Sequence, residues 1–194
     1  MNLLQQLSRE MSDAVARTRR SLVQISNGRQ GEGAGILWSA DGLIITNAHV
    51  VRRQHLRVTL PDGRTLPARV LAHDPERDVA ALRVDADGLP AMPLGDSDSL
   101  QPGEWAFAVG HPFGVTGAAT AGVVIGRGTA LPEQARGRDW VAVALRLRPG
   151  NSGGPLVDAR GRLIGVNTIM TGPEAGGAVP VNVVRAFLRE RLGL

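Results

Sequence analysis

The chain has 194 residues, a formal net charge of +4 and no cysteine. It contains no run of about 18 consecutive apolar residues, so the sequence predicts no membrane-spanning segment. The absence of cysteine excludes disulfides and metal–thiolate sites but does not indicate a compartment. The positive charge comes from arginines spread along the chain among acidic residues, which favours a solvated surface over a nucleic-acid binding site.

Residues 2–20 have the spacing of an amphipathic helix. Apolar side chains recur every three or four residues, at Leu3, Leu4, Leu7, Met11, Ala14 and Val15. We therefore treat residues 1–21 as an N-terminal helix that either packs against the body or contacts another protomer. This segment becomes polar too early to be a signal-peptide core. We expect a cytoplasmic protein if the chain is complete, and a periplasmic or extracytoplasmic one if a signal or anchor was removed.

The rest of the chain shows the pattern of an all-β protein in two successive lobes. In the first lobe, about residues 22–100, the apolar runs are Leu22–Ile25, Ala34–Trp38, Leu43–Thr46, Leu56–Leu60, Ala68–His73 and Val79–Val84. The second lobe covers about residues 101–182, with runs at Trp105–Val109, Thr120–Ile125, Trp140–Leu145, Leu156–Val157, Leu163–Ile169 and Ala178–Val181. Asp41-Gly42 and Asp62-Gly63 are hairpin signals. A short helix over 183–192, with Asn182 as N-cap, ends the chain. Short strands without alternating helices favour barrels or sandwiches.

The stretch Pro149–Pro155 places one serine among glycines, in the order Pro-Gly-Asn-Ser-Gly-Gly-Pro. A backbone with few Cβ atoms can expose the Ser152 hydroxyl as a nucleophile. The backbone N–H groups of Gly150 and Ser152 are expected to form an oxyanion hole, with the Asn151 amide as a third contributor. The alternative is an ordinary serine in a glycine-rich turn.

A serine nucleophile needs a base and a group that orients the base. His49 and Asp78 supply both, and the order His, Asp, Ser is that of the catalytic residues in chymotrypsin. His111 is the rival base, and Asp74 is a competing acid whose surroundings are typical of a turn. His49 and Asp78 belong to the first lobe and Ser152 to the second, so the site is expected where the lobes meet.

These motifs resemble those of the HtrA (DegP-like) serine proteases. The similar segments are Thr46–Val51, Asp78–Val84, Gly95–Gly114, Gly150–Leu156 and Gly165–Thr168, within a similarity that covers about residues 22–190. The resemblance implies a trypsin-like double β-barrel with short terminal helices. It also implies a His49–Asp78–Ser152 triad that hydrolyses peptide bonds in unfolded or damaged proteins, without metal, nucleotide or other cofactor.

The resemblance further implies substrate contacts and an assembly. Substrate-binding residues would be Leu147, Asn167, Thr168 and Met170. Leu147 and Met170 would form the walls of an apolar pocket, which favours cleavage after Val, Ala, Ile or Leu and offers no partner for Arg or Lys. The resemblance also implies a homo-oligomer, with a trimer as the family's form, although the N-terminal helix lacks the aromatic residues that often build that trimer.

Two departures from the family pattern stand out. Family members usually continue into PDZ domains, whereas this chain ends at Leu194, either as a minimal protease or as an excised domain. The family commonly has Asp-Ala-Ala-Ile-Asn-Pro before the Gly-Asn-Ser motif, whereas this chain has Ala-Leu-Arg-Leu-Arg-Pro over residues 144–149.

Two other functions compete with an endopeptidase. The first is a catalytically silent peptide-binding or scaffold protein with the same fold, which the presence of all three triad residues argues against. The second is an esterase with the same triad, which is less favoured because the serine motif lacks the strand-to-helix context of α/β-hydrolases.

Overall fold

A computed structural model describes residues 2–26, 32–51, 55–128, 138–170 and 174–194. The side chains of Glu32, Ile169 and Met170 lie outside this description. The elements are α1 (Leu3–Arg19), β1 (Leu22–Ser26), β2 (Glu32–Leu37), β3 (Leu43–Thr46), η1 (Ala48–Val50), β4 (Leu56–Thr59), β5 (Thr65–Asp74), β6 (Val79–Val84), η2 (Ser97–Ser99), β7 (Trp105–Gly110), η3 (Pro112–Gly114), β8 (Ala118–Gly128), β9 (Trp140–Val143), β10 (Pro155–Asp158), β11 (Leu163–Met170), β12 (Gly176–Pro180) and α2 (Val181–Leu192).

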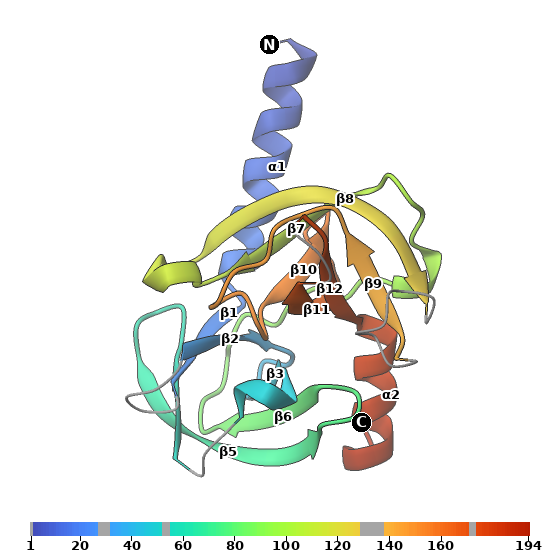
Figure 1. Cartoon of the computed structure of the whole chain (residues 1–194). Helices are drawn as coiled ribbons and strands as arrows, with labels where there is room; N and C mark the ends of the chain where they lie inside the picture. The colour runs from blue at the N-terminus through green and yellow to red at the C-terminus, as the bar shows by residue number, and fades with distance from the viewer. Residues whose placement is uncertain (1, 27–31, 52–54, 129–137, 171–173) are drawn as a thin grey trace.

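The strands form two closed antiparallel barrels, which confirms the predicted double-barrel fold (Figure 1). The first barrel has the order β1-β2-β3-β6-β5-β4 and closes through the pairing of β1 with β4. The second barrel repeats that order as β7-β8-β9-β12-β11-β10 and closes through β10 and β7. Closure leaves no long sheet edge exposed in either barrel.

The predicted hairpin signals lie at tight turns. Gly42, between β2 and β3, has a φ of 90°, and Gly63, between β4 and β5, has a φ of 89°. Glycine adopts such positive φ angles without the steric cost that a Cβ atom imposes. The Asp-Gly pairs therefore position the strands that lead to the candidate site.

The largest buried cluster joins the two barrels. Ile45 and Val79 of the first barrel pack in one cluster with Phe107 and Trp140 of the second and with Phe187 of α2. Each barrel also has its own buried apolar cluster. Fully burying one large apolar side chain contributes about 1.5–3 kcal/mol, so the shared cluster stabilises the packing of the two barrels against each other.

The C-terminal helix begins at Val181, two residues before the predicted start, and Asn182 is not its N-cap. The side chain of Asn182 donates instead to Asp96 Oδ1 (2.7 Å), and its backbone N–H donates to Ser97 Oγ (3.2 Å). Ser97, in the segment between the barrels, therefore provides an acceptor for one backbone N–H of the first turn of α2, which has no capping side chain of its own.

Helix α1 extends away from the barrels at its N-terminal end (Figure 1). Asn2 and Gln5 form a capping box at its start. Ala14 and Thr18 are buried against the body, whereas Leu3 and Leu4 are 80% and 75% exposed. No helix within the described ranges is long and apolar enough to cross a membrane.

Candidate active site

The three predicted catalytic residues lie on connections at the boundary between the barrels. His49 lies in η1, which follows β3. Asp78 directly precedes β6, and Ser152 lies in the turn before β10. The backbone N–H of Ala34 in β2 donates to the Ser152 carbonyl oxygen (2.9 Å), which ties the serine of the second barrel to the first. The fold therefore brings residues from both lobes together, as the sequence predicts.

His49 and Asp78 form a hydrogen-bonded pair. His49 Nδ1 lies 3.0 Å from Oδ1 and 2.9 Å from Oδ2 of Asp78. An ionised carboxylate only accepts hydrogen bonds, so Nδ1 carries the proton. In neutral His49 the Nε2 lone pair can then accept a proton from a reacting group, which is the tautomer that a general base requires.

The backbone conformation of Asp78 aims its carboxylate at His49. Asp78 is one of two described non-glycine residues with positive φ (55°), a conformation that aspartate tolerates better than most residues. Asp78 Oδ1 also accepts from the backbone N–H of His49 (3.0 Å). Burial raises the pKa of the Asp78 carboxyl, but hydrogen bonds from His49 and Thr168 outweigh it, and the pKa lies below its ordinary value.

Thr168 in β11 links the acid and the serine. Its hydroxyl donates to Asp78 Oδ2, and its backbone carbonyl accepts a hydrogen bond from Ser152 Oγ (3.2 Å). The sequence assigns Thr168 to substrate binding, whereas in the structure it is buried and bound to two members of the proposed triad. The hydroxyl of Ser152 rests on the Thr168 carbonyl in this structure.

Asn47, which the sequence analysis did not single out, also connects the three segments. Its Nδ2 donates to the Asp78 carbonyl oxygen (3.0 Å), and its Oδ1 accepts from the backbone N–H of Gly153 (2.7 Å). Asn47 is fully buried. Gly153 has a φ of 82°, and a Cβ atom there would lie 2.1 Å from the Ala34 carbonyl oxygen. The close approach of the two barrels beside Ser152 therefore requires glycine.

The predicted oxyanion hole lies in a tight turn. The backbone N–H of Asn151 donates to the Arg148 carbonyl (2.9 Å), with Pro149 and Gly150 at the centre of the turn. Gly150 has a φ of 99°, as the third residue of a type II turn requires. Among the described residues, the backbone N–H groups of Gly150 and Ser152 have no hydrogen-bond partner. The Asn151 amide closes the turn, so the structure does not support it as a third oxyanion donor.

Of the predicted substrate-binding residues, Leu147 and Met170 lie beside Gly176, whereas Asn167 is buried between strands. Leu147 is buried beside Gly176, where a Cβ atom would lie 3.0 Å from Leu147 Cγ. The backbone of Met170 pairs with the same glycine, although its side chain lies outside the described residues. Asn167 is fully buried, and its Nδ2 donates to the Pro155 carbonyl (2.8 Å). Its side chain therefore holds β10 and β11 together and does not face a substrate.

The rival residues have structural roles. Asp74 Oδ1 accepts hydrogen bonds from the backbone N–H groups of Glu76 and Arg77 (3.0 Å each), which is the expected turn chemistry. His111 is 4% exposed, and its Nε2 donates to the Val23 carbonyl (3.2 Å). Its ring therefore does not serve as the base for Ser152.

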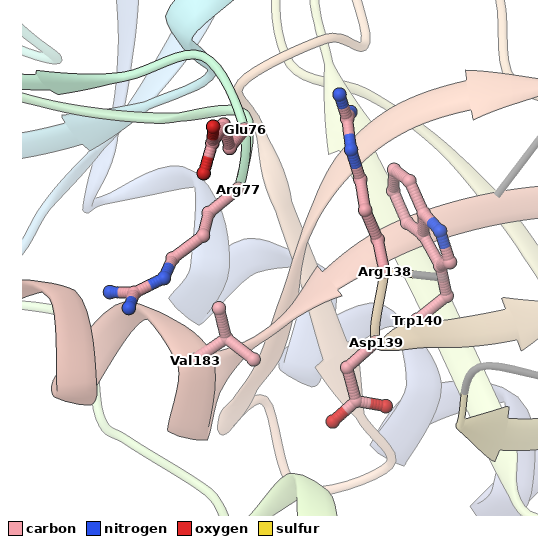
Figure 2. A pocket seen from close by; sticks show the side chains of 6 residues that line it. All are labelled: Glu76, Arg77, Arg138, Asp139, Trp140 and Val183. Carbon is pink, nitrogen blue, oxygen red and sulfur yellow. The ribbon is translucent and has the colours of Figure 1, made fainter. Parts of the chain in front are cut away.

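A separate cavity of about 180 Å³ is lined by Glu76 and Arg77, the two residues before Asp78 (Figure 2). Its lining residues are Glu76, Arg77, Arg138, Asp139, Trp140 and Val183. Arg77 extends toward α2 and pairs with Glu190 (2.7 Å). Charges of both signs line this cavity, and within the described part of the chain no group of three His, Asp or Glu side chains could hold a metal ion.

Two antiparallel barrels of this strand order, with a histidine, an aspartate and a serine gathered between them, define a trypsin-like serine peptidase. A family model described as "Trypsin-like peptidase domain" matches residues 33–166. The chain belongs to this family, and its relatives are HtrA-type, DegP-like serine proteases.

Three comparisons illustrate the relationship. "Protease Do-like 1, chloroplastic" of Arabidopsis thaliana is 42% identical over 166 residues, which cover 80% of this chain and 38% of that protein. "Probable periplasmic serine endoprotease DegP-like" of Halomonas elongata is 40% identical over 166 residues, which cover 81% of this chain and 34% of that protein. The solved structure "HtrA-type protease AlgW with tripeptide" has a TM-score of 0.87 and 33% identity, and covers 94% of this chain and 64% of that chain. The chain thus spans less than two fifths of the length of these two curated relatives.

Proposed function

We propose that this chain is a serine endopeptidase in which Ser152 is the nucleophile, His49 the general base and Asp78 the residue that orients the base. The observation that carries the proposal is the bond between His49 Nδ1 and Asp78 (2.9 Å), in a network that also reaches Ser152. Thr168 contacts both the acid and the serine, and Asn47 binds the segments on which they lie.

The reaction proceeds in two stages. Ser152 Oγ attacks the scissile carbonyl carbon while His49 Nε2 takes the hydroxyl proton, and Asp78 stabilises the imidazolium that forms. The backbone N–H groups of Gly150 and Ser152 bind the oxyanion. His49 gives its proton to the leaving amine, which departs and leaves an acyl group on Ser152. Water, deprotonated by His49, then attacks the acyl carbon, and the proton returns to Ser152 Oγ.

The first step requires that the hydroxyl of Ser152 turn from the Thr168 carbonyl to the His49 ring. The resting hydrogen bond of 3.2 Å joins neutral groups, and such a bond contributes only about 0.5–1.5 kcal/mol net. Rotation of one side chain is therefore a small part of the barrier. In the resting structure the Ser152 hydroxyl therefore points to the Thr168 carbonyl and away from the base, and only a side-chain rotation is needed to change this.

The substrate in this proposal is an unfolded or damaged polypeptide, cut after a small or medium aliphatic residue. Leu147 lies next to Gly176 and supplies one apolar wall of the pocket. The family resemblance assigns the second wall to Met170, whose backbone pairs with the same glycine. A pocket without a carboxylate leaves Arg or Lys unpaired, which costs free energy. The AlgW structure holds a tripeptide, which supports a peptide as the ligand.

Assembly and location complete the proposal. The exposed leucines at the free end of α1 support a contact with further copies, and we propose the homotrimer that the resemblance implies. The name of the Halomonas elongata relative favours the periplasmic of the two expected locations.

The test uses a fluorophosphonate probe, which labels an activated serine. The wild-type chain should be labelled and should cleave casein, and Ser152→Ala should lose both. Ser99→Ala, which removes an exposed serine in η2, is the matched control and should keep both. Labelling that survives in Ser152→Ala would contradict the assignment of the nucleophile. A wild-type chain that binds peptide without labelling or turnover would instead support the silent scaffold, and ester turnover without casein cleavage the esterase.

A further inference from the structure

A small cavity lies beside the turn that presents Gly150. It has a volume of about 190 Å³ and is lined by Pro112, by residues 118–120 of β8, and by Arg146, Arg148 and Asn151. It contains no acidic lining residue among those described. Its two lining arginines, Arg146 and Arg148, belong to the segment 144–149, in which this chain differs from the common family sequence.

The two arginines give the cavity a positive rim. Both are exposed, and the guanidinium of Arg148 lies 5.8 Å from the centre of the Phe113 ring. This contact with an aromatic face restrains the Arg148 side chain. A planar guanidinium matches a carboxylate better than an ammonium does, because two N–H groups meet two oxygens.

Asn151 adds a second, independent sign of a ligand. It is 3% exposed, and its Oδ1 accepts from the backbone N–H of Arg148 (2.9 Å). Its Nδ2 has no hydrogen-bond partner among the described residues. Asn151 is itself one of the residues that line the cavity. An oxygen ligand in the cavity would give this donor an acceptor.

The same asparagine stabilises the turn over residues 148–151, which we call the oxyanion turn because it carries the N–H of Gly150. Its backbone N–H bonds to the Arg148 carbonyl (2.9 Å), and its side chain bonds to the Arg148 N–H (2.9 Å). A ligand that binds Asn151 Nδ2 and the Arg148 guanidinium would therefore hold both ends of the turn whose centre carries Gly150. A ligand shifts a conformational equilibrium only by binding one state more tightly. A ligand that contacts Asn151 Nδ2 and the Arg148 guanidinium together would favour the turn in which these two residues are hydrogen-bonded.

We propose that this cavity binds a carboxylate group of a polypeptide, through Arg146, Arg148 and Asn151 Nδ2, and that its occupation stabilises the oxyanion turn. The carboxylate comes from an acidic side chain or from a C-terminus, both of which accept bidentate hydrogen bonds. A polypeptide that enters the neighbouring active site carries such groups at high local concentration. The effect on turnover rests on the proposed peptidase function, whereas the binding does not.

Binding is tested in the Ser152→Ala variant, so that peptides are not consumed. Two peptide pairs are titrated by calorimetry at low salt: one pair differs by Glu against Gln, the other by a free against an amidated C-terminus. In at least one pair, the carboxylate peptide should bind about tenfold more tightly, the effect of one charge-assisted hydrogen bond. The advantage should fall with rising salt and disappear in Arg146→Gln/Arg148→Gln.

Arg160→Gln is the matched control, because it removes one exposed arginine of the β10–β11 turn. It should keep the advantage of the carboxylate peptide. Equal binding within both pairs, or an advantage that survives in the double variant, would overturn the proposed site. The pair that shows the difference identifies the source of the carboxylate.

The effect on turnover is measured with a neutral reporter peptide and an added non-cleavable acidic peptide. Occupation of the cavity should raise kcat in the wild-type chain and leave it unchanged in Arg146→Gln. Binding without any rise in kcat would overturn the coupling to the turn. Failure of the proposed function has a different signature, since the wild-type chain would then show neither probe labelling nor turnover while the calorimetry still reports on the cavity.

Discussion

The backbone N–H of His111 donates a hydrogen bond to the carbonyl oxygen of Gly150 (2.9 Å). The ring of His111 spans the boundary between the barrels, because its Nε2 donates to the carbonyl of Val23 in β1. Its Nδ1 accepts from the backbone N–H of Gly117 (3.4 Å). One neutral histidine thus connects the first barrel, the loop after β7 and the oxyanion turn.

Replacing His111 with Leu should lower both stability and turnover. The Val23 carbonyl and the Gly117 N–H would lose a partner, at about 1–3 kcal/mol for a buried unsatisfied group. The Gly150 turn keeps its backbone bonds, so kcat should fall by less than the about 10²- to 10³-fold that follows complete loss of one oxyanion donor. Urea unfolding and kcat measure the two effects. His55→Gln, at an exposed histidine, is the control, and equal kcat values in both variants would contradict this role for His111.

Replacing Asp78 with Asn should lower kcat by about 10⁴-fold, because the amide favours the wrong tautomer of His49. Asp74→Asn should have a small effect on kcat, since Asp74 accepts backbone bonds in a turn. Steady-state kinetics on one peptide compares the two variants. The assignment of the acid fails if Asp74→Asn is crippling and Asp78→Asn is neutral.

The stability that the ionised Asp78 contributes should depend on pH. Its folded-state pKa is depressed, so this contribution is present above the unfolded-state value of about 3.9 and is lost as the pH falls through the folded-state pKa. The difference in unfolding free energy between wild type and Asp78→Asn should therefore be largest near neutral pH and shrink at strongly acidic pH. Urea titrations at a series of pH values measure it, and a difference that grows on acidification would contradict the sign.

Proteolysis should be most frequent after Val, Ala, Ile or Leu. Mass-spectrometric mapping of casein fragments checks this, and cuts mostly after Arg or Lys would refute the apolar pocket. Gly176→Ala should narrow the pocket, because the added Cβ would lie 3.0 Å from Leu147 Cγ. The preference for Leu over Ala should then fall by about 10-fold or more, the effect of one misplaced methylene group.

Local signals in the sequence predicted most of the fold. Asp41-Gly42 and Asp62-Gly63 mark hairpins because glycine adopts positive φ angles that other residues avoid. The prediction that Asn182 is the N-cap of α2 is wrong. Asn182 instead binds Ser97 and Asp96, which lie 85 and 86 residues earlier in the chain. Such partners exist only after the barrels have docked, so no local pattern reports them.

The candidate site divides in the same way. Short motifs identified His49, Asp78 and Ser152, which the structure gathers at one boundary. The positions of Thr168 and Asn47 could not be predicted, because their bonds cross 90 and 106 residues of chain. A sequence shows that a side chain can form hydrogen bonds. Whether its partner is a substrate or a neighbouring strand depends on how the two barrels pack together.

The cluster that joins Ile45, Phe107 and Phe187 has a consequence for folding. Each barrel has a core of its own, so each can acquire its strands before the two halves meet. Before that contact forms, the first barrel would carry His49 and Asp78 without Ser152 beside them. On the proposed mechanism, Ser152 becomes reactive only when the second barrel has docked beside His49, so probe labelling during refolding would report the time of docking.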